Sequence, residues 1–361
     1  MDDLEEATGI SESVHRSFFH KFVHFGETVL YPKYVKYPKC QEEAATHTME
    51  YQIAGLCGAI GSMDSCHVIM EKCSHRLKQN HFGGKSKQTC RSFNLTCNHR
   101  RKILHTTSGH PARWNDKTIV LFDDFATDLR NGNIMGDNSF VLFEHDGSDI
   151  IVEVKYCGAW LIVDNGYLEW SVTIPPMKDT MYYKETRWSE WMESMRKDVE
   201  CTFGILKGRF RILKAGVRCH GVDVTDKIWK TCCALHNVLL EKDGLSHEWS
   251  GALGEFDFDE ETDEIPFALQ RLSSPSERRQ YDDSGMGPGV LHDEDDGDIS
   301  VIPPAPILFG AVRPDDINNV HQISMDVFQN KLIEHFDILF QKNEIRWPKS
   351  NVGNCRMPTP L

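Results

Sequence analysis

Three acidic residues lie where an α/β protein could present them to one cleft. Asp64 lies in the middle of residues 60–68, whose alternating pattern predicts a strand. Asp164 follows a short apolar strand predicted over 160–163 and precedes an Asn-Gly pair, a common way to present a ligand at the carboxyl end of a strand. Glu200 lies at the edge of an amphipathic helical stripe. These positions could bring three carboxylates together.

Carboxylates that converge in this way need a positive counter-charge. Two of them 4–5 Å apart repel each other by roughly 3–4 kcal/mol at an effective dielectric constant near 20. Mg²⁺ or Mn²⁺ would cancel this repulsion, because hard divalent cations prefer oxygen ligands. Two such ions about 4 Å apart can activate a water or a 3′-hydroxyl and stabilise the leaving oxygen of a phosphodiester. The candidate chemistry is metal-dependent phosphodiester cleavage, with Asp64, Asp164 and Glu200 as catalytic and metal-binding residues.

Each of these residues also has an ordinary structural interpretation. Asp64 could be a turn residue within the segment GSMDS, and Asp164 could simply end its strand. Glu200 beside Lys and Arg is typical of a solvated helix surface, where ion pairs contribute little. The local sequence leaves both interpretations open at all three positions.

The helix that carries Glu200 is predicted over residues 187–214. Apolar residues recur there at the spacing of a buried stripe, namely Val199, Phe203, Leu206, Phe210 and Leu213. A second line of residues runs beside this stripe and consists of Arg196, Glu200, Gly204, Lys207 and Arg211. One carboxylate is thus placed at the edge of the core, with cations one and two turns further along.

The composition favours a globular protein with one large core. The chain has 361 residues, of which 40% are hydrophobic, and no apolar run is long enough to cross a membrane. The acidic first residues contain no apolar segment of the kind found in secretory signals, so we expect the twelve cysteines to be reduced thiols. No membrane partner is expected.

The charge is distributed unevenly along the chain. Residues 1–240 contain 30 basic and 30 acidic residues, whereas residues 241–361 contain 10 and 24 and carry the whole net charge of −14. From Lys72 to Arg113 there are ten Lys or Arg and no Asp or Glu, which indicates a surface that faces a polyanion, although a solvated loop with chance clustering is the alternative. The candidate phosphate contacts are Lys85, Lys87, Arg91, Arg100, Arg101, Lys207 and Arg211.

The chain divides into four predicted regions. Residues 1–50 form a helical segment, which is either a packing helix or the remnant of a helix-turn-helix. Its helix is predicted to have Ser11 as its N-cap and an apolar face formed by Val14, Phe18, Phe22 and Phe25. Residues 51–242 form the α/β domain, and the polar, acidic residues 243–320 form a disordered linker. Residues 321–361 contain an amphipathic helix that docks on the domain or pairs with another chain. His236 and its neighbouring cysteines lack a second ligand pair, so a structural histidine is favoured over a zinc site.

Five motifs in order resemble those of PIF/Harbinger-type DDE transposases: IGSMDSCH, GHPARWND, LIVDNGY, RKDVECTFGILKGRFRIL and CCALHN. The resemblance extends to the N-terminal GISES and the C-terminal HFDILFQKNEIRWP and covers most of the chain apart from the acidic linker. It implies a ribonuclease-H-like fold, a mixed sheet flanked by helices, in which Asp64, Asp164 and Glu200 form the metal-binding triad. Asp164 and Glu200 are separated by 35 residues, a spacing similar to that of other DDE enzymes. Asp116 would have a structural or supporting role.

The chain also departs from the family pattern, because Cys201-Thr202 stands where the family has Arg-Ala after the triad glutamate. The resemblance implies a nuclear protein that acts on DNA, with a separate Myb/SANT-like protein as a candidate DNA-binding partner and a homodimer as a candidate assembly. Our leading hypothesis is a DNA endonuclease or transposase with two Mg²⁺ or Mn²⁺ ions. The alternatives are a domesticated DNA-binding or scaffold protein without catalysis, and a metal-dependent ribonuclease with the same fold.

Overall fold

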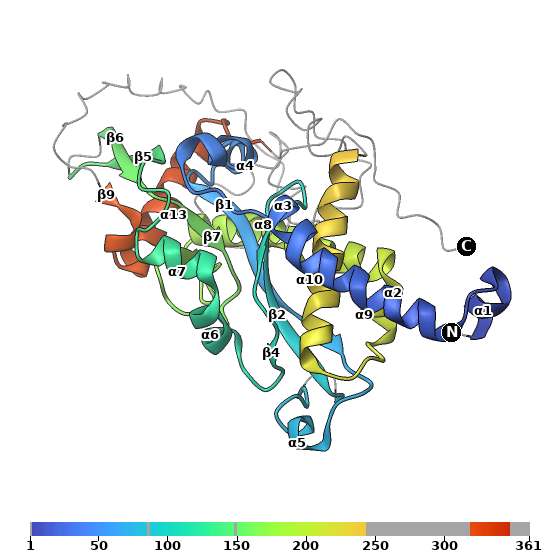
Figure 1. The fold of residues 1–361 in the computed structure, drawn as a ribbon. Helices are drawn as coiled ribbons and strands as arrows, with labels where there is room; N and C mark the ends of the chain where they lie inside the picture. The colour runs from blue at the N-terminus through green and yellow to red at the C-terminus, as the bar shows by residue number, and fades with distance from the viewer. Residues whose placement is uncertain (1, 85–86, 148–149, 243–317, 347–361) are drawn as a thin grey trace, which may run out of the picture.

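A central mixed sheet organises the computed structural model, which describes residues 2–84, 87–147, 150–242 and 318–346 (Figure 1). The strand order is β3-β2-β1-β7-β8, with β4 added to β2. β1, β2 and β3 are antiparallel, whereas β7 and β8 run parallel to β1. The strands are β1 (Ala59–Ile69), β2 (Cys90–Cys97), β3 (Ile103–Thr106), β4 (His110–Pro111), β7 (Trp160–Ile162) and β8 (Thr173–Ile174).

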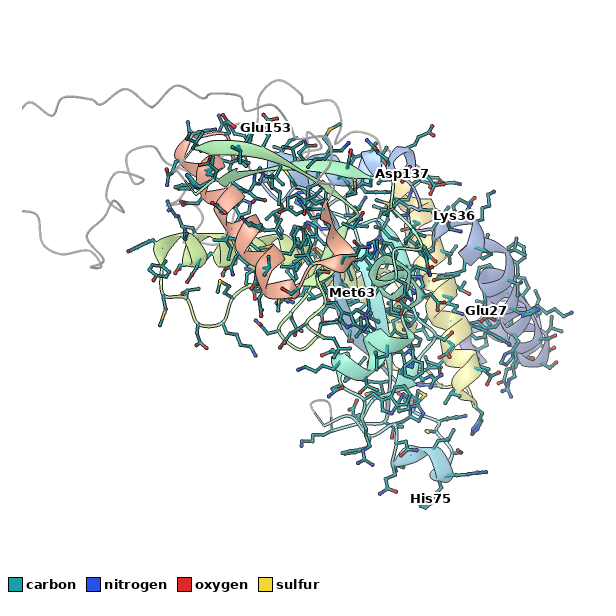
Figure 2. All side chains as sticks on the ribbon, turned by 90° about the vertical axis from the view of Figure 1, so that its left-hand side faces the viewer. Glu27, Lys36, Met63, His75, Asp137 and Glu153 are labelled. Carbon is teal, nitrogen blue, oxygen red and sulfur yellow. The ribbon has the colours of Figure 1, made fainter. Side chains whose placement is uncertain are left out.

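β1 is the central strand and confirms the strand predicted from the alternating pattern. Ile60, Ser62, Cys66 and Val68 are all buried, and Met63 on the opposite face is buried as well. Figure 2 shows Met63 in the interior of the molecule, whereas His75 marks the end of a projection beyond the sheet. Asp64 therefore lies within a strand and not in a turn.

A second, smaller sheet packs beside the first. It contains β5 (Ser139–His145), β6 (Ile151–Cys157) and β9 (Asn318–Asn319) in the order β5-β6-β9. β5 and β6 are paired antiparallel as a hairpin. Residues 243–317 of the predicted acidic linker lie outside the described residues. Asn318 and Asn319 pair in parallel with β6, so this end of the predicted linker is part of the fold.

Helices cover both faces of the main sheet (Figure 1). α10 (Val222–Lys242) packs on one face with α2 (Glu12–Phe25), the π-helical turn η1 (Gly26–Leu30) and α3 (Tyr31–Tyr34). These helices and the sheet enclose one hydrophobic core. A second hydrophobic core contains residues of α4 (Gln41–Ile53), α7 (Asp124–Arg130) and α13 (Met325–Gln341). Shorter helices are α1 (Asp2–Thr8), α5 (His75–Lys78), α6 (Asp116–Ile119), the 3₁₀ turns η2 (Val120–Phe122) and η5 (Val320–Gln322), and α9 (Arg211–Ala215).

α8 (Tyr183–Arg209) crosses from one core to the other. Trp188 and Met195 belong to the core that contains α13, whereas Val199 and Leu206 belong to the core that contains α10. The Ser62 hydroxyl donates a hydrogen bond of 3.2 Å to the Met195 carbonyl, which fixes the crossing point beside β1. The predicted helix 187–214 is divided at Phe210, whose backbone leaves the helical conformation before α9 begins.

The C-terminal amphipathic helix docks on the domain. Its apolar residues Phe328, Leu332 and Phe336 are buried in the core shared with β7 and α8. None of the helices in the described part of the chain is long and apolar enough to cross a membrane.

The N-terminal helix forms as predicted but packs through a different face. Val14 and Phe18 of the predicted apolar face are exposed, whereas Val23 is buried. The reason is Gly26, where an added Cβ would lie only 2.1 Å from the Thr231 hydroxyl of α10. Because Gly26 lies so close to α10, Val23 and Gly26 are buried against that helix. Phe18 is therefore exposed to solvent. The predicted Ser11 cap makes no capping hydrogen bond from its side chain.

Candidate metal-binding and nucleic-acid site

The parallel pairing of β1 and β7 brings Asp64 and Asp164 near each other. Ser62 pairs with Ile162, the last residue of β7, and two residues further along the chain are Asp64, within β1, and Asp164, just beyond the end of β7. Carboxyl ends of parallel strands meet at one edge of a sheet, where ligand sites of α/β proteins commonly lie. The charge of Asp164 contributes to raising the pKa of Asp64, so the two carboxylates lie near each other.

Asp64 is a largely buried carboxylate, with 21% of its side chain exposed. Its Oδ1 accepts a hydrogen bond of 2.7 Å from the Ser65 amide. The pKa of Asp64 is raised to about 6, mainly by burial; the charges of Asp164 and Asp116 also raise it, whereas the Ser65 amide and Arg196 lower it. The site therefore holds negative charge that the fold only partly compensates.

Asp116 lies next to Asp164 in space, although the two residues are far apart in the sequence. The Gly166 amide donates a hydrogen bond of 2.6 Å to Asp164 Oδ1. A Cβ on Gly166 would lie 2.8 Å from that oxygen and 3.1 Å from Asp116 Oδ2, so the two carboxylates flank the same small space. Asp116 opens α6, whose cap residue Asn115 accepts a hydrogen bond of 2.9 Å from the Thr118 amide. Asp64, Asp116 and Asp164 thus form an aspartate cluster.

A network of hydrogen bonds between buried polar side chains lies next to the aspartate cluster. The Tyr167 hydroxyl donates a hydrogen bond of 2.6 Å to Asn94 Oδ1, and the Asn94 amide donates one of 2.8 Å to Asp123. Asp123 in turn caps α7 by accepting a hydrogen bond from the Ala126 amide. Burial, followed by the charges of Asp64 and Asp116, raises the pKa of Tyr167 well above its usual value, so its phenol stays neutral. This network joins β2 to α7 and was not recognised in the sequence.

In the described part of the chain, Arg196 links Glu200 to the aspartate cluster. Arg196 Nη2 lies 2.9 Å from Glu200 Oε1, and its Nη1 lies 3.6 Å from Asp64 Oδ2. The same guanidinium binds Glu193 through Nε at 3.0 Å. Glu200 has 48% of its side chain exposed, whereas Arg196 has 14%. Arg196 was only one member of a helical line in the sequence, but in the fold it lies between two of the three candidate ligands.

The donor atoms suit a hard divalent cation, since the aspartate cluster offers carboxylate oxygens alone. Within the described residues, however, no group of three or more His, Cys, Asp or Glu side chains is arranged to hold a metal ion. The predicted third ligand, Glu200, is bound to Arg196, while Asp116 shares the space beside Asp164. The chemistry of the donors therefore fits Mg²⁺ or Mn²⁺, but the fold does not assemble the three predicted ligands directly.

Two of the predicted phosphate contacts are neutralised inside the fold. Arg91 forms a bidentate pair with Asp226, at 2.8 Å from Nε and 2.7 Å from Nη2. Arg100 is buried and paired with Glu50, with its Nε 2.6 Å from Oε1. Because both guanidinium groups already have carboxylate partners, neither is included in the phosphate-binding surface proposed below.

The remaining predicted phosphate contacts differ in exposure. Lys87 and Arg211 are exposed, and Lys207 and Arg101 are half-buried. Lys207 lies close enough to Cys66 to lower the pKa of that thiol against the larger raising effect of burial. Lys85 lies outside the described residues.

His236 has the structural role predicted for it. Its Nε2 lies 2.9 Å from the Arg101 carbonyl, and burial lowers its pKa to about 4. Asn237 beside it accepts a hydrogen bond from the Ile103 amide and donates one to the Ile103 carbonyl. α10 thereby binds the edge strand β3 through side chains.

One comparison with known proteins identifies a family. A family model described as plant transposon protein matches residues 32–247, a range that contains Asp64, Asp116, Asp164 and Glu200. Neither the curated proteins nor the solved structures include a significant match. Because the matched range exceeds half of the chain, the chain belongs to the plant transposon protein family.

Proposed function

We propose that this chain is a divalent-metal-dependent DNA endonuclease of the transposase type, with a ribonuclease-H-like core and a PIF/Harbinger origin. The observation that carries the proposal is that Asp164, just beyond the end of β7, lies near Asp64 of the adjacent parallel strand β1, close enough for its charge to raise the pKa of Asp64. Membership of a transposon protein family supports DNA as the substrate. The antiparallel run β3-β2-β1 followed by parallel β7 and β8 supports the proposed fold class.

In this proposal Asp64 and Asp164 are the first two ligands of Mg²⁺ or Mn²⁺, and Glu200 is the third. When bound, the ions supply a nucleophile and stabilise the leaving oxygen of the scissile phosphodiester. Asp116 keeps the space beside Asp164 negative and supports the ligands from α6. Glu200 lies on an exposed helix face, where it is paired with Arg196. To act as a ligand, its carboxylate would leave the Arg196 guanidinium and bind the ion instead.

The DNA backbone would follow the cations around the site. Lys87, Lys207, Arg211 and Arg101 remain the candidates for phosphate contacts, since each is at least partly exposed, unlike the buried Arg100. The proposed location is the nucleus. A separate Myb/SANT-like protein would supply further DNA recognition, and a homodimer would place two sites on the two ends of an element.

A second candidate function has its own supporting observation. Arg196 already provides a positive charge between Asp64 and Glu200, which suits a domesticated DNA-binding or scaffold protein without catalysis. The two functions differ in metal binding. Calorimetric titration with Mn²⁺ would show carboxylate-dependent binding in the enzyme and none in the scaffold.

Two glutamates on α8 provide a matched test. Glu200 and Glu193 both pair with Arg196, at 2.9 Å and 3.0 Å, and are similarly exposed. Glu200→Gln is expected to slow DNA cleavage by about 10²-fold, because it removes a proposed ligand. Glu193→Gln removes the same type of ion pair without removing a ligand and is expected to change the rate by less than about threefold.

The measurement is nicking of supercoiled and terminal-repeat DNA by the full chain with Mg²⁺, Mn²⁺ or EDTA. Equal losses in the two variants would show that the ion pairs matter and not the ligand, which contradicts the role of Glu200. Absence of cleavage by the wild type with either ion would favour the scaffold function. Faster cleavage of an RNA duplex than of DNA would favour a ribonuclease.

A further inference from the structure

Three aromatic rings pack against one another in a compact group beside the aspartate cluster. His110 and Trp114 are stacked with centroids 5.4 Å apart, and Trp114 and Phe122 are stacked at 5.2 Å. His110 and Phe122 are 5.6 Å apart, so each ring contacts the other two. We call His110, Trp114 and Phe122 the ring stack. They come from β4, the turn after it and η2.

The ring stack is open to solvent. Trp114 is 37% exposed and Phe122 is 55% exposed, and the neighbouring Leu121 is exposed as well. Single exposed apolar residues are ordinary in folded proteins and need no explanation. A group of packed rings with two exposed members and an exposed leucine beside them is different, because apolar surface gathered at one place is typical of an interaction site.

The ring stack is held rigidly by the surrounding backbone. His110 pairs with Ser92 of β2, and the Trp114 amide donates a hydrogen bond of 2.9 Å to the Pro111 carbonyl. The Arg91–Asp226 ion pair packs against Gly109, where an added Cβ would lie 2.4 Å from Arg91 Nε. A surface that is already ordered loses little conformational entropy when it binds a ligand.

Exposed cations flank the ring stack, and the aspartate cluster lies next to it. Arg113 and Lys117 are both exposed, and neither forms an ion pair with a described carboxylate. Asp116 is two residues beyond Trp114 and shares the space beside Gly166 with Asp164. Figure 1 shows α6, which Asp116 opens, between α7 and β4. The three rings, the two cations and one carboxylate of the aspartate cluster thus all come from residues 110–122.

We propose that the ring stack is a platform for an unpaired nucleobase of the DNA strand being processed. Aromatic rings beside cations are the combination that binds single-stranded nucleic acid, since every base has a stacking face and every nucleotide a phosphate. Arg113 and Lys117 bind the phosphates that flank the stacked base. The choice of DNA rests on the proposed function, whereas the stacking itself depends only on the ring stack.

The test measures binding of a fluorescent single-stranded oligonucleotide to the full chain in EDTA, where no cleavage occurs. Trp114→Ala and Phe122→Ala are each expected to weaken binding about tenfold, the loss of one base–ring contact. Trp114→Phe keeps a stacking ring and is expected to stay within about threefold of the wild type. Phe18→Ala is the matched control, because Phe18 is an exposed ring on α2 with no part in the ring stack.

A blunt duplex of the same sequence is expected to show a smaller loss, because its bases are already stacked on one another. Equal binding by the wild type and both alanine variants would overturn the proposal, as would absence of single-strand binding by the wild type. A wild type that does not cleave DNA but binds single strands through Trp114 would refute the endonuclease and retain the platform. The reverse result, cleavage without dependence on the rings, would retain the endonuclease and refute the platform.

Discussion

Replacement of Asp64 by Asn is expected to abolish DNA cleavage and, at neutral pH, to stabilise the fold. The cleavage rate should fall on the order of 10³-fold, because the variant lacks a proposed metal ligand on the central strand. The stability should rise because the wild-type carboxylate is largely buried beside Asp164 and Asp116. An essential residue whose removal stabilises the protein is typical of a functional site and unusual for a structural carboxylate.

The pH dependence of stability gives the sign of this effect. Folding raises the pKa of Asp64 from 3.8 to about 6, so the native state binds the proton more tightly than the unfolded state does. Stability is therefore lost as the pH rises from about 4 to about 6, by at most about 3 kcal/mol. The amide side chain of the variant carries no charge, so the difference between variant and wild type should grow over this window and stay constant above it.

Chemical denaturation of both proteins in EDTA at about pH 4 and about pH 7.5 measures this difference. Added Mn²⁺ should then raise the unfolding temperature of the wild type, because a ligand that binds only the native state stabilises it, and should leave the variant unchanged. A variant that is less stable than the wild type at the higher pH would contradict the burial argument. A variant that cleaves DNA within about threefold of the wild-type rate would remove Asp64 from the proposed site.

The second large effect concerns the buried pair of Arg100 and Glu50. Replacement of Arg100 by Met is expected to destabilise the fold by about 3–5 kcal/mol, because it leaves the Glu50 carboxylate charged and without its partner in the interior. The pair joins α4 to the turn between β2 and β3, and both side chains are buried. Urea denaturation at neutral pH measures the loss.

Two further variants separate charge from packing. In the double variant with Met in place of both Glu50 and Arg100, no unpaired charge remains, so most of the lost stability should return. The control is Arg16→Met, because Arg16 and Glu12 form an ion pair on the exposed surface of α2. That change should cost less than about 0.5 kcal/mol. A loss of this small size for Arg100→Met as well would show that the buried pair contributes nothing.

Local patterns predicted the elements that carry the candidate ligands. The alternation around Asp64 predicted β1, the apolar run before Asp164 predicted β7, and the stripe beside Glu200 predicted α8. These signals are reliable because strand and helix periodicities come from neighbours a few residues apart. The same type of pattern was misleading at Phe18, which is exposed, whereas Phe22 of the same predicted face packs against the core and Gly26 makes a close contact with α10.

Charged groups show the limit of this reasoning. Arg91 and Arg100 were predicted to face phosphates because no acidic residue lies near them in sequence, yet Asp226 and Glu50 neutralise them in the fold. Asp226 is 135 residues away from Arg91, so no local pattern contains the pair. The basic stretch is therefore less basic at the surface than its composition indicated.

The sequence by itself determined the central strands, the helix α8 and the types of residue available for phosphodiester chemistry. Only the tertiary structure decided how those residues meet: Asp164 beside Asp116, and Glu200 joined to Asp64 through Arg196. The physical reason is the distance along the chain between the residues that determine each property. Backbone periodicity is set by contacts within one or two turns, whereas the charge of a site depends on side chains that the chain brings together from separate elements.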